Sequence, residues 1–301
     1  MAQKKLQRFL EIGSFPNVMQ YPEGMPGKWH EHFRNNNPIL LELACGKGEY
    51  TTGLAELYPD KNIIGIDIKG NRIWVGAKLA MEKNLSNAAF LRTQIGKLDE
   101  YFSLGEVDEI WITFPDPQLR TSRAKKRLTH PRYLRIYKNI LKENGRIHLK
   151  TDSPELYMFT KTVIDMYGLT LINDMDDVYA SSQLDPELNI QTHYESLDIA
   201  MSKKIFYLSF TLPSSIEHKD EELHARIKDT EWKRTIEGFL FPGCDEEDFY
   251  YEDGFMVMSE KFHLKRGYCC GNGCRHCPYN YDRVPEPRRH KLLSLKHHGK
   301  K

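Results

Sequence analysis

Residues 110 to 117 read Ile110-Trp111-Ile112-Thr113-Phe114-Pro115-Asp116-Pro117, and the architecture of the chain can be built from this stretch. The apolar run that ends at Phe114 predicts a strand buried on both faces, as in a parallel sheet. The two prolines fix their own φ angles and bias the residue before each toward extended geometry. Asp116 is therefore expected to stand stiffly at the carboxyl end of the strand. Ligands of open α/β sheets bind at that edge, so Asp116 is expected to lie at a binding site.

A basic segment follows this acid directly. It contains five cations, Arg120, Arg123, Lys125, Lys126 and Arg127. A rigid carboxylate beside a basic loop predicts a site that holds a nucleobase while it grips the phosphates around it. The alternative is an ordinary strand end followed by a solvated run of charge.

The region from residue 38 to 212 alternates apolar strands with helical patterns. Expected strands are Ile39–Leu43, Asn62–Ile66, Ala88–Leu91, Glu109–Phe114, Gly145–Lys150 and Ile205–Thr211, and expected helices are Glu49–Tyr58, Asn71–Asn84, Pro131–Leu141 and Glu155–Tyr167. This rhythm predicts an α/β, Rossmann-like fold with a mostly parallel sheet and helices on both faces. The long, acidic stretch Asn173–Glu195 is expected to be a loop over the active edge.

The composition predicts three parts: an N-terminal extension (1–37), the α/β domain (38–215) and a small Cys-rich appendage (216–301) whose basic tail, 288–301, is expected to be disordered. The net charge of the 301 residues is only +1, so attraction to nucleic acid must come from a local patch. No apolar stretch approaches membrane-spanning length, and the N-terminus lacks the apolar core of a signal peptide. These features predict a cytoplasmic protein without a membrane partner, and they leave its oligomeric state open.

The first strand and the turn after it read Leu41-Glu42-Leu43-Ala44-Cys45-Gly46-Lys47-Gly48-Glu49-Tyr50. The third glycine of a dinucleotide fingerprint is replaced by Thr51, and no Gly-Lys-Ser/Thr follows, so a pyrophosphate ligand is disfavoured. Glu42 can supply negative charge near an ammonium or sulfonium, and Asp67, at the end of the second strand, can accept hydrogen bonds from ribose hydroxyls. Together with Gly46 and Gly48 they predict an S-adenosylmethionine site. The alternative is a common glycine turn with Asp67 as a helix cap.

Four cysteines lie close together near the C-terminus: Cys269, Cys270, Cys274 and Cys277. Their spacing is C-x3-C-x2-C or C-x4-C-x2-C, and the glycines and the proline around them predict a tight loop in which thiolates converge on zinc or an iron–sulfur cluster. The alternative is a group of reduced or redox-active thiols.

From about residue 30 to 212 the chain resembles the bacterial tRNA (guanine-N7)-methyltransferase family. The resemblance rests on five motifs: Leu-Glu-Leu-Ala-Cys-Gly-Lys-Gly at 41–48, Gly-Ile-Asp at 65–67, Phe-Pro-Asp-Pro at 114–117 with Lys-Lys-Arg at 125–127, Lys-Thr-Asp at 150–152, and Thr-His-Tyr-Glu at 192–195. The resemblance implies methyl transfer from S-adenosylmethionine to N7 of the variable-loop guanine of tRNA (position 46). The block 255–279 is similar to a small domain of unknown function, and no activity follows from that likeness.

The family pattern implies that Glu42, Asp67 and Asp116 contact the methyl donor and that Asp116 is the catalytic acid. It implies that Arg120, Asp152, Thr192, His193, Tyr194 and Glu195 contact the RNA, and we expect Lys125, Lys126 and Arg127 to bind its phosphates.

The chain departs from the family pattern at three positions. Gln118 replaces a usual Trp, and Arg120 stands where a Lys is common. Gln94 is the best match to an Asp that faces the adenine. A catalytically silent tRNA-binding scaffold that carries a metal or redox module is the alternative function.

Overall fold

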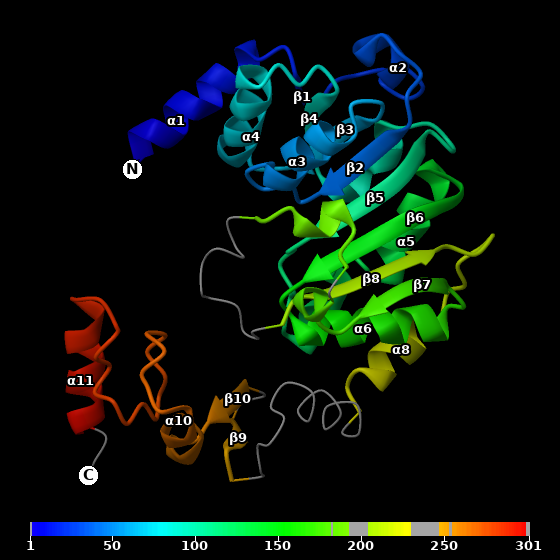
Figure 1. Cartoon of the computed structure of the whole chain (residues 1–301). Helices are drawn as coiled ribbons and strands as arrows, with labels where there is room; N and C mark the ends of the chain where they lie inside the picture. The colour runs from blue at the N-terminus through cyan, green and yellow to red at the C-terminus, as the bar shows by residue number, and fades with distance from the viewer. Residues whose placement is uncertain (1, 182, 193–203, 230–246, 253–254, 299–301) are drawn as a thin grey trace. The chain divides into compact units, whose positions relative to one another are not determined.

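The computed structural model describes residues 2–181, 183–192, 204–229, 247–252 and 255–298 (Figure 1). The chain forms two compact units, Met1–Ile236 and Glu237–Lys301.

The described residues of the first unit contain a sheet of eight strands in the order β1-β4-β3-β2-β5-β6-β8-β7. The strands are β1 (Val18–Gln20), β2 (Ile39–Leu43), β3 (Asn62–Asp67), β4 (Ala88–Arg92), β5 (Val107–Thr113), β6 (Leu141–Thr151), β7 (Thr170–Met175) and β8 (Phe206–Thr211). Neighbours from β1 to β6 run parallel, whereas β8 is antiparallel to both β6 and β7. The six strands expected from the sequence are present, and the mostly parallel sheet is confirmed.

Helices cover both faces of this sheet, as neighbouring residues of β8 show. Phe206 stacks on Tyr157 of α6 (Pro154–Met166), with ring centroids 4.9 Å apart. Tyr207 lies beside Trp111 of β5, which in turn contacts Tyr50 of α3 (Glu49–Leu57). Because successive side chains of a strand point to opposite faces, α3 and α6 lie on opposite sides. All five residues of β2 are buried, as expected for a strand covered on both faces.

Two helices of the first unit, α5 (Pro131–Ile140) and α6, begin where the sequence offers local start signals. Ser153 and His130 cap α6 and α5, and a proline occupies the first turn of each. Besides α3, α5 and α6, the helices in the described part of the first unit are α1 (Ala2–Glu11), α2 (Trp29–Phe33), α4 (Gly70–Glu82) and α8 (Asp220–Arg226), with short 3-10 turns at η1 (Ile12–Ser14), η2 (Ile95–Glu100), η3 (Thr121–Lys126), η4 (Val178–Ala180) and η5 (Pro186–Asn189).

Two strands were not expected from the sequence. The stretch 1–37 is more than an extension, because β1 pairs with β4 at one edge of the sheet. The segment expected to be a loop from Asn173 begins inside β7 at the other edge. Five of the six residues of β7 are exposed, so the strand lacks the apolar alternation by which a sequence indicates a strand.

The expected boundary at residue 215 also differs from the structure, in which α8 belongs to the first unit. Arg135 of α5 donates to the carboxylate of Asp220 at 2.6 Å, and its guanidinium also binds the carbonyl of Glu217. Tyr167 donates to the same carboxylate at 3.0 Å. These polar contacts tie residues 216–227 to the α/β domain, although their composition is acidic and unlike that of the domain.

The second unit contains a hairpin and two helices in its described part. Strands β9 (Phe249–Glu252) and β10 (Phe255–Met258) pair antiparallel, and α10 (Glu260–Arg266) and α11 (Arg288–His298) follow. The loop between the helices carries the cysteine cluster, where Cys269, Cys277, Tyr281 and Val284 form a small buried core. The tail expected to be disordered forms α11 over most of its length.

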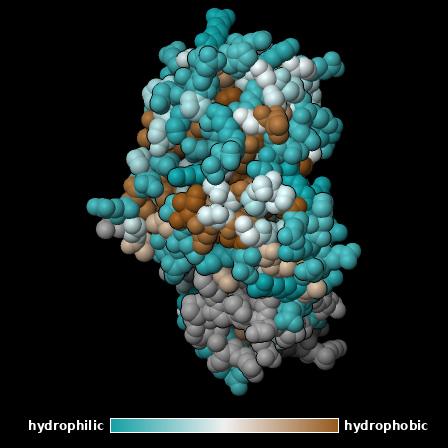
Figure 2. All heavy atoms as spheres, turned by 90° about the vertical axis from the view of Figure 1, so that its right-hand side faces the viewer, coloured by the Kyte–Doolittle hydropathy of each residue, from teal (hydrophilic) through white to brown (hydrophobic). Residues whose placement is uncertain are grey.

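The surface of the molecule is mixed. Hydrophilic residues cover most of the side turned to the viewer in Figure 2, and hydrophobic residues reach the surface in patches between them. More than half of the surface of an ordinary folded protein is apolar, so this composition does not indicate a docking surface. In the described part of the chain, no helix combines the length and the apolar character needed to cross a lipid bilayer.

Candidate active site

A cavity of about 460 Å³ opens at the carboxyl ends of four neighbouring strands, β3, β2, β5 and β6. The arrowheads of β2 and β6 point to this edge in Figure 1. The cavity has the volume of a pocket for a small-molecule ligand. Its lining residues are Glu42, Ala44, Cys45, Gly46, Glu49, Asp67, Lys69, Arg72, Thr113, Phe114, Pro115, Asp116, Pro117, Asp152 and Thr192.

The backbone is strained where two of these strands end. Ala44 and Phe114 have φ angles of 58° and 44°, a left-handed conformation that side chains other than glycine adopt rarely. Such residues cluster at functional sites, because the surrounding structure must hold them in place. At Gly48 a side chain is excluded outright, since φ is 71° and a Cβ atom would lie 2.6 Å from the ring of Phe90. Gly48 therefore shapes the turn without lining the cavity.

Glu42 is a buried carboxylate at the base of the cavity, with an exposed fraction of 2%. Thr51 donates to one of its oxygens from both the backbone N–H, at 2.7 Å, and the hydroxyl. The hydroxyl of Thr113 donates to the other oxygen at 2.6 Å. Burial raises the pKa of Glu42 to about 7, although the hydrogen bonds from Thr113 and Thr51 act in the opposite direction. The group therefore changes charge near neutral pH.

Asp67 lies at the end of β3 and closes the glycine turn. Its carboxylate accepts hydrogen bonds from the backbone N–H of Gly46 at 3.0 Å and of Lys69 at 2.8 Å. These contacts fix the carboxylate between the turn and the start of α4. A carboxylate has about four acceptor positions, so two remain for hydroxyl donors in the cavity.

Asp116 is exposed at the mouth of the cavity. The expected extended geometry before Pro115 is absent, because Phe114 has a φ of 44°. One of its oxygens accepts a hydrogen bond from the N–H of Gln118 at 3.0 Å, and Gln118 itself has a φ of 48°. Within the described part of the chain, the other carboxylate oxygen has no hydrogen-bond partner. The loop therefore fixes the position of the acid and leaves one side of it open to a ligand.

Asp152 and Thr192 also line the cavity, so the structure brings both next to Asp116. Asp152 follows β6 and precedes the cap of α6, and Thr192 comes after η5. The other predicted residues of that segment, His193, Tyr194 and Glu195, lie outside the described residues.

The remaining predicted residues do not line the cavity. Gln94 is exposed after the end of β4, so an adenine contact from this residue stays a prediction. Three of the expected phosphate ligands, Arg120, Lys125 and Lys126, are exposed on or next to η3.

Arg127 departs from the prediction because its side chain is buried, with an exposed fraction of 1%. Its guanidinium forms an ion pair with Glu155 at 2.8 Å and donates to the carbonyls of Pro117 and Gln118 at 3.2 and 3.3 Å. A guanidinium enclosed in this way does not reach a phosphate in solvent. The predicted phosphate contact of Arg127 is therefore wrong, and the residue instead fastens the loop after Asp116 to α6.

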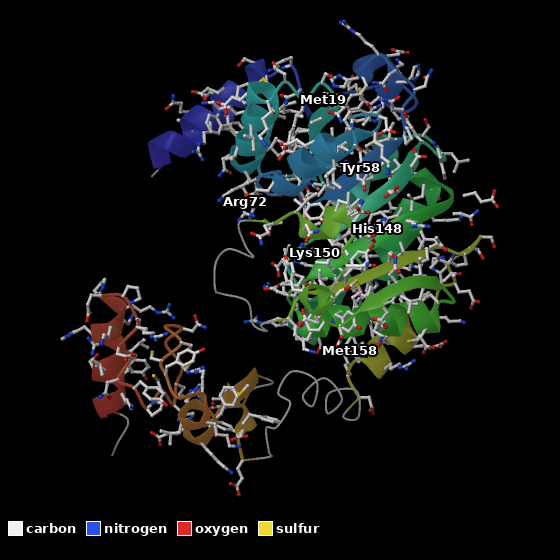
Figure 3. The ribbon with its side chains drawn as sticks, in the orientation of Figure 1. Met19, Tyr58, Arg72, His148, Lys150 and Met158 are labelled. Carbon is white, nitrogen blue, oxygen red and sulfur yellow. The ribbon has the colours of Figure 1, made fainter. Side chains whose placement is uncertain are left out.

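The sequence reasoning missed two cations that line the cavity, Lys69 and Arg72 (Figure 3 labels Arg72). Both lie at the start of α4, directly after Asp67. Their position in the sequence could have indicated this role, because the first turn of a helix that follows a strand at the binding edge lies near the ligand.

Lys150 begins the Lys-Thr-Asp motif at 150–152, which predicted no separate role for it. Its side chain is fully buried beside the site (Figure 3). Its ammonium donates to the carbonyls of Leu188 and Ile190 at 2.9 and 3.1 Å. A Cβ atom on Gly53 of α3 would lie 2.8 Å from Ile190, so the same segment also packs closely on that helix. These contacts hold the segment that leads to Thr192.

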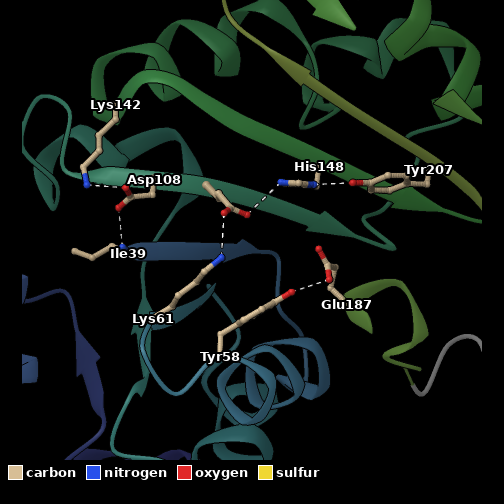
Figure 4. Close-up of polar contacts among 9 residues, drawn as sticks. Ile39, Tyr58, Lys61, Asp108, Lys142, His148, Glu187 and Tyr207 are labelled. Atoms are coloured by element: carbon tan, nitrogen blue, oxygen red, sulfur yellow. Dashed lines mark hydrogen bonds and ion pairs between the residues drawn. The ribbon is translucent and has the colours of Figure 1, made fainter. Parts of the chain in front are cut away.

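A partly buried polar network crosses the strands behind the site (Figure 4). Glu109 of β5 binds Lys61 and His148 at 3.3 Å each, and His148 shares a hydrogen bond of 2.8 Å with Tyr207 of β8. Burial alone would raise the pKa of Glu109, but His148 and Lys61 outweigh it and lower the pKa to about 2. The network links β5, β6 and β8, and so it stiffens the strand that ends at the Asp116 loop.

The four cysteines between residues 269 and 277 form two close pairs. The sulfur atoms of Cys270 and Cys274 are 3.3 Å apart, and those of Cys269 and Cys277 are 3.7 Å apart. All four are free thiols. Among the residues that the structure describes, no group of three or more His, Cys, Asp or Glu side chains is arranged to hold a metal ion.

Comparison with known proteins identifies the family to which the first unit belongs. A family model described as "Putative methyltransferase" matches residues 36–208, and a model for a family of unknown function matches residues 242–283. The tRNA (guanine-N(7)-)-methyltransferase of Porphyromonas gingivalis is 49% identical over 211 residues, which cover 66% of this chain and 86% of that protein. The protein of the same name from Bacteroides fragilis is 42% identical over 75% of this chain and 93% of its own length. This chain belongs to the tRNA (guanine-N7)-methyltransferase family.

The buried carboxylate of this methyltransferase gives a pH-dependent stability that can be measured. The folded-state pKa of Glu42 is about 7, against 4.5 for an ordinary glutamate, so its contribution to stability is fully present below pH 4.5 and is lost as pH rises toward 7. The loss amounts to at most about 3 kcal/mol. We expect the Glu42→Gln variant to gain in free energy of unfolding relative to the natural protein across this window. Urea unfolding at several pH values measures the free energy of unfolding of both proteins, and the exposed Glu23→Gln variant is the control. If the free-energy difference between Glu42→Gln and the natural protein stayed constant from pH 4.5 to 7, the raised pKa of Glu42 would be contradicted.

The burial of Arg127 gives a second expectation. Replacement by Ala removes a buried guanidinium and leaves the half-buried carboxylate of Glu155 without its partner, which should cost about 3 kcal/mol of unfolding free energy. The neighbouring Lys126→Ala removes an exposed side chain and should change stability by less than about 0.5 kcal/mol. Thermal or urea unfolding of the two variants makes the comparison, and equal small effects would show that Arg127 does not anchor the loop.

Proposed function

We propose that this protein transfers a methyl group from S-adenosylmethionine to N7 of the variable-loop guanine of tRNA. One observation carries the proposal: a single cavity joins the carboxylates of Glu42 and Asp67, at the ends of β2 and β3, to Asp116 at the end of β5. The family relationship supports the same activity. The predicted cytoplasmic location stays a prediction.

The donor half of the cavity suits an adenosine ligand with a cationic group. When bound, S-adenosylmethionine supplies a methyl group on a positively charged sulfur, already activated for transfer. Asp67 would accept hydrogen bonds from the ribose hydroxyls, and ionised Glu42 would favour the positive charge of the donor. The glycine turn at Gly46 lets the backbone approach the ligand closely, since a side chain is absent there.

The acceptor half needs alignment more than acid–base chemistry. N7 of guanine carries a lone pair and no proton, so no base is required to expose the nucleophile. Positive charge grows on the purine as it is methylated, and a fixed carboxylate beside the ring stabilises that charge. In this proposal Asp116 supplies the carboxylate and accepts hydrogen bonds from the N1 and N2 groups of guanine. Its rigid loop, fastened by Arg127, keeps the acid in place during the reaction.

The RNA backbone would lie across the exposed cations that surround the cavity. In this proposal η3 and its N-terminal cap offer Arg120, Arg123, Lys125 and Lys126, and the start of α4 offers Lys69 and Arg72. Asp152 and Thr192, which also line the cavity, would orient the base. Contacts from His193, Tyr194 and Glu195 stay predictions.

A catalytically silent tRNA-binding scaffold is not favoured. A protein that only bound RNA would have no need for a buried carboxylate held by three hydrogen bonds next to a glycine turn, because a buried charge of this kind is costly to maintain.

Asp116→Asn tests the catalytic assignment, because the amide keeps the shape of the side chain and removes its charge. We expect kcat to fall by about 100-fold or more, with tRNA and donor affinities changed by less than about threefold. Methylation of a tRNA transcript is measured with labelled donor, and a transcript with adenine in place of the variable-loop guanine serves as the negative substrate. Exposed Asp60→Asn is the matched control. Near-normal kcat in Asp116→Asn would reject the catalytic role, and methylation of the adenine transcript would reject the proposed position.

We propose further that the second unit binds zinc or an iron–sulfur cluster through Cys269, Cys270, Cys274 and Cys277. Four free thiols in two close pairs support the proposal, since both kinds of centre are held by thiolates. The described arrangement does not yet fit such a centre, because it brings sulfur atoms together only in pairs. Binding would have to draw the two pairs to one point.

Elemental analysis and a visible spectrum of anaerobically purified protein test this second proposal. We expect about one zinc per chain, or iron with visible absorption, and we expect Cys277→Ser to lose it while Cys45→Ala in the other unit retains it. Metal content at the level of the buffer would reject the proposal.

A further inference from the structure

Residues 261–298 of the second unit concentrate positive charge, whereas the sequence just before them, 245–260, is acidic. Residues 261–298 hold nine basic side chains, Lys261, Lys265, Arg266, Arg275, Arg283, Arg288, Arg289, Lys291 and Lys296, and two acidic ones, Asp282 and Glu286. The whole protein has a net charge of only +1. A local excess of this kind, and not the overall charge, governs attraction to a polyanion.

Only three of these nine cations form ion pairs within the described residues. Lys261 binds Glu247 and Lys265 binds Asp248 at 2.6 Å each, and Arg275 binds Glu252. In the same part of the chain the other six have no carboxylate at ion-pair distance. Their charge is therefore available to a ligand, except at the buried Nη2 atom of Arg266.

Four of these six cations are held in place by backbone carbonyls. Arg288 donates to the carbonyl of Asn272 at 3.1 Å, Arg289 to that of Asn280 at 3.2 Å, and Lys296 to that of Cys277 at 2.7 Å. Arg266 donates to the carbonyl of Tyr268 at 3.0 Å. A carbonyl orients a cation without cancelling its charge, so these contacts fix the positive groups on the cysteine loop.

An exposed aromatic ring lies between two of these cations. Tyr268 has an exposed fraction of 44%, and the guanidinium groups of Arg266 and Arg283 lie 5.5 and 4.9 Å from its ring centre. Cations that neutralise phosphates, together with an aromatic face on which a base can stack, are the usual elements of RNA-binding surfaces.

We propose that this Arg–Tyr surface, made of Tyr268, Arg266, Arg283, Arg288, Arg289, Lys291 and Lys296, binds the sugar–phosphate backbone of tRNA. The inference rests on the proposed function for the choice of RNA. The first unit would methylate the tRNA, and the Arg–Tyr surface would bind the same tRNA at a second place. This surface belongs to the unit that matches a family of unknown function. Because both contacts belong to one chain, the second raises affinity for tRNA without changing the chemical step.

Two double variants of the full-length protein test the proposal. Arg283→Gln/Lys291→Gln removes two cations of the Arg–Tyr surface. Lys261→Gln/Arg275→Gln removes the same two residue types from the same unit, where each is paired with a carboxylate. Thermal unfolding checks that both variants fold. Binding of an unmodified tRNA is measured as a function of salt concentration, and methylation kinetics are measured on the same tRNA.

For the Arg283/Lys291 variant we expect KM for tRNA to rise by about tenfold with kcat unchanged, and the slope of log affinity against log salt to shrink by about 1.5. The Lys261/Arg275 variant should show a smaller change in both quantities. Tyr268→Ala should weaken binding without reducing the salt slope, because it removes stacking and no charge.

Three outcomes overturn the proposal. Unchanged tRNA affinity in the Arg283/Lys291 variant would show that the surface does not contact RNA, and equal losses in both double variants would indicate a general charge effect. If the Arg283/Lys291 variant lost binding to anionic phospholipid vesicles and kept its tRNA binding, the surface would be assigned to a membrane. Failure of the proposed function is distinguishable, because a protein that does not methylate tRNA can still bind it through this surface.

Discussion

The active site depends on the hydrogen bonds of one buried carboxylate. Glu42 of β2 accepts from Thr51 in the first turn of α3 and from Thr113 at the end of β5. It thereby joins the glycine turn, where the donor would bind, to the strand that carries Asp116. A buried carboxylate is unfavourable unless its oxygens accept hydrogen bonds. Any movement of the turn away from β5 would break these hydrogen bonds and so raise the free energy of the folded state. The two halves of the cavity are consequently held in one geometry.

The basic segment after Asp116 serves two different purposes in the fold. Arg120, Arg123, Lys125 and Lys126 are exposed, whereas Arg127 is buried against Glu155 and the carbonyls of the preceding loop. Arg127 resembles its neighbours in the sequence, but its side chain is buried and holds the loop in place. This division explains how an exposed loop with a non-glycine residue at positive φ, Gln118, can be held stiffly enough to position a carboxylate.

The distribution of charge reconciles a nearly neutral chain with a polyanionic substrate. Lys69 and Arg72 lie at the cavity, η3 adds its exposed cations, and the Arg–Tyr surface adds a third group in the second unit. The compensating acids lie largely elsewhere, for example around α8, where Asp220 is paired with Arg135. Electrostatic attraction falls off within about 10 Å in physiological salt, so local clusters can bind RNA even though the total charge is +1.

The presence of the central strands, the glycine turn and the Pro-Asp-Pro loop could be predicted from the residues alone. Strands buried on both faces have continuous apolar runs, and prolines act through their own covalent geometry. β1 and β7 could not be found in this way, because edge strands need not bury their side chains and gain their hydrogen bonds from a distant partner. The burial of Arg127 against Glu155, the anchoring of residues 188–190 by Lys150 and the placement of Arg283 at Tyr268 likewise arise from contacts between residues that are not neighbours in the chain. Local sequence carries the preference for an element, whereas burial and pairing depend on which elements the fold brings together.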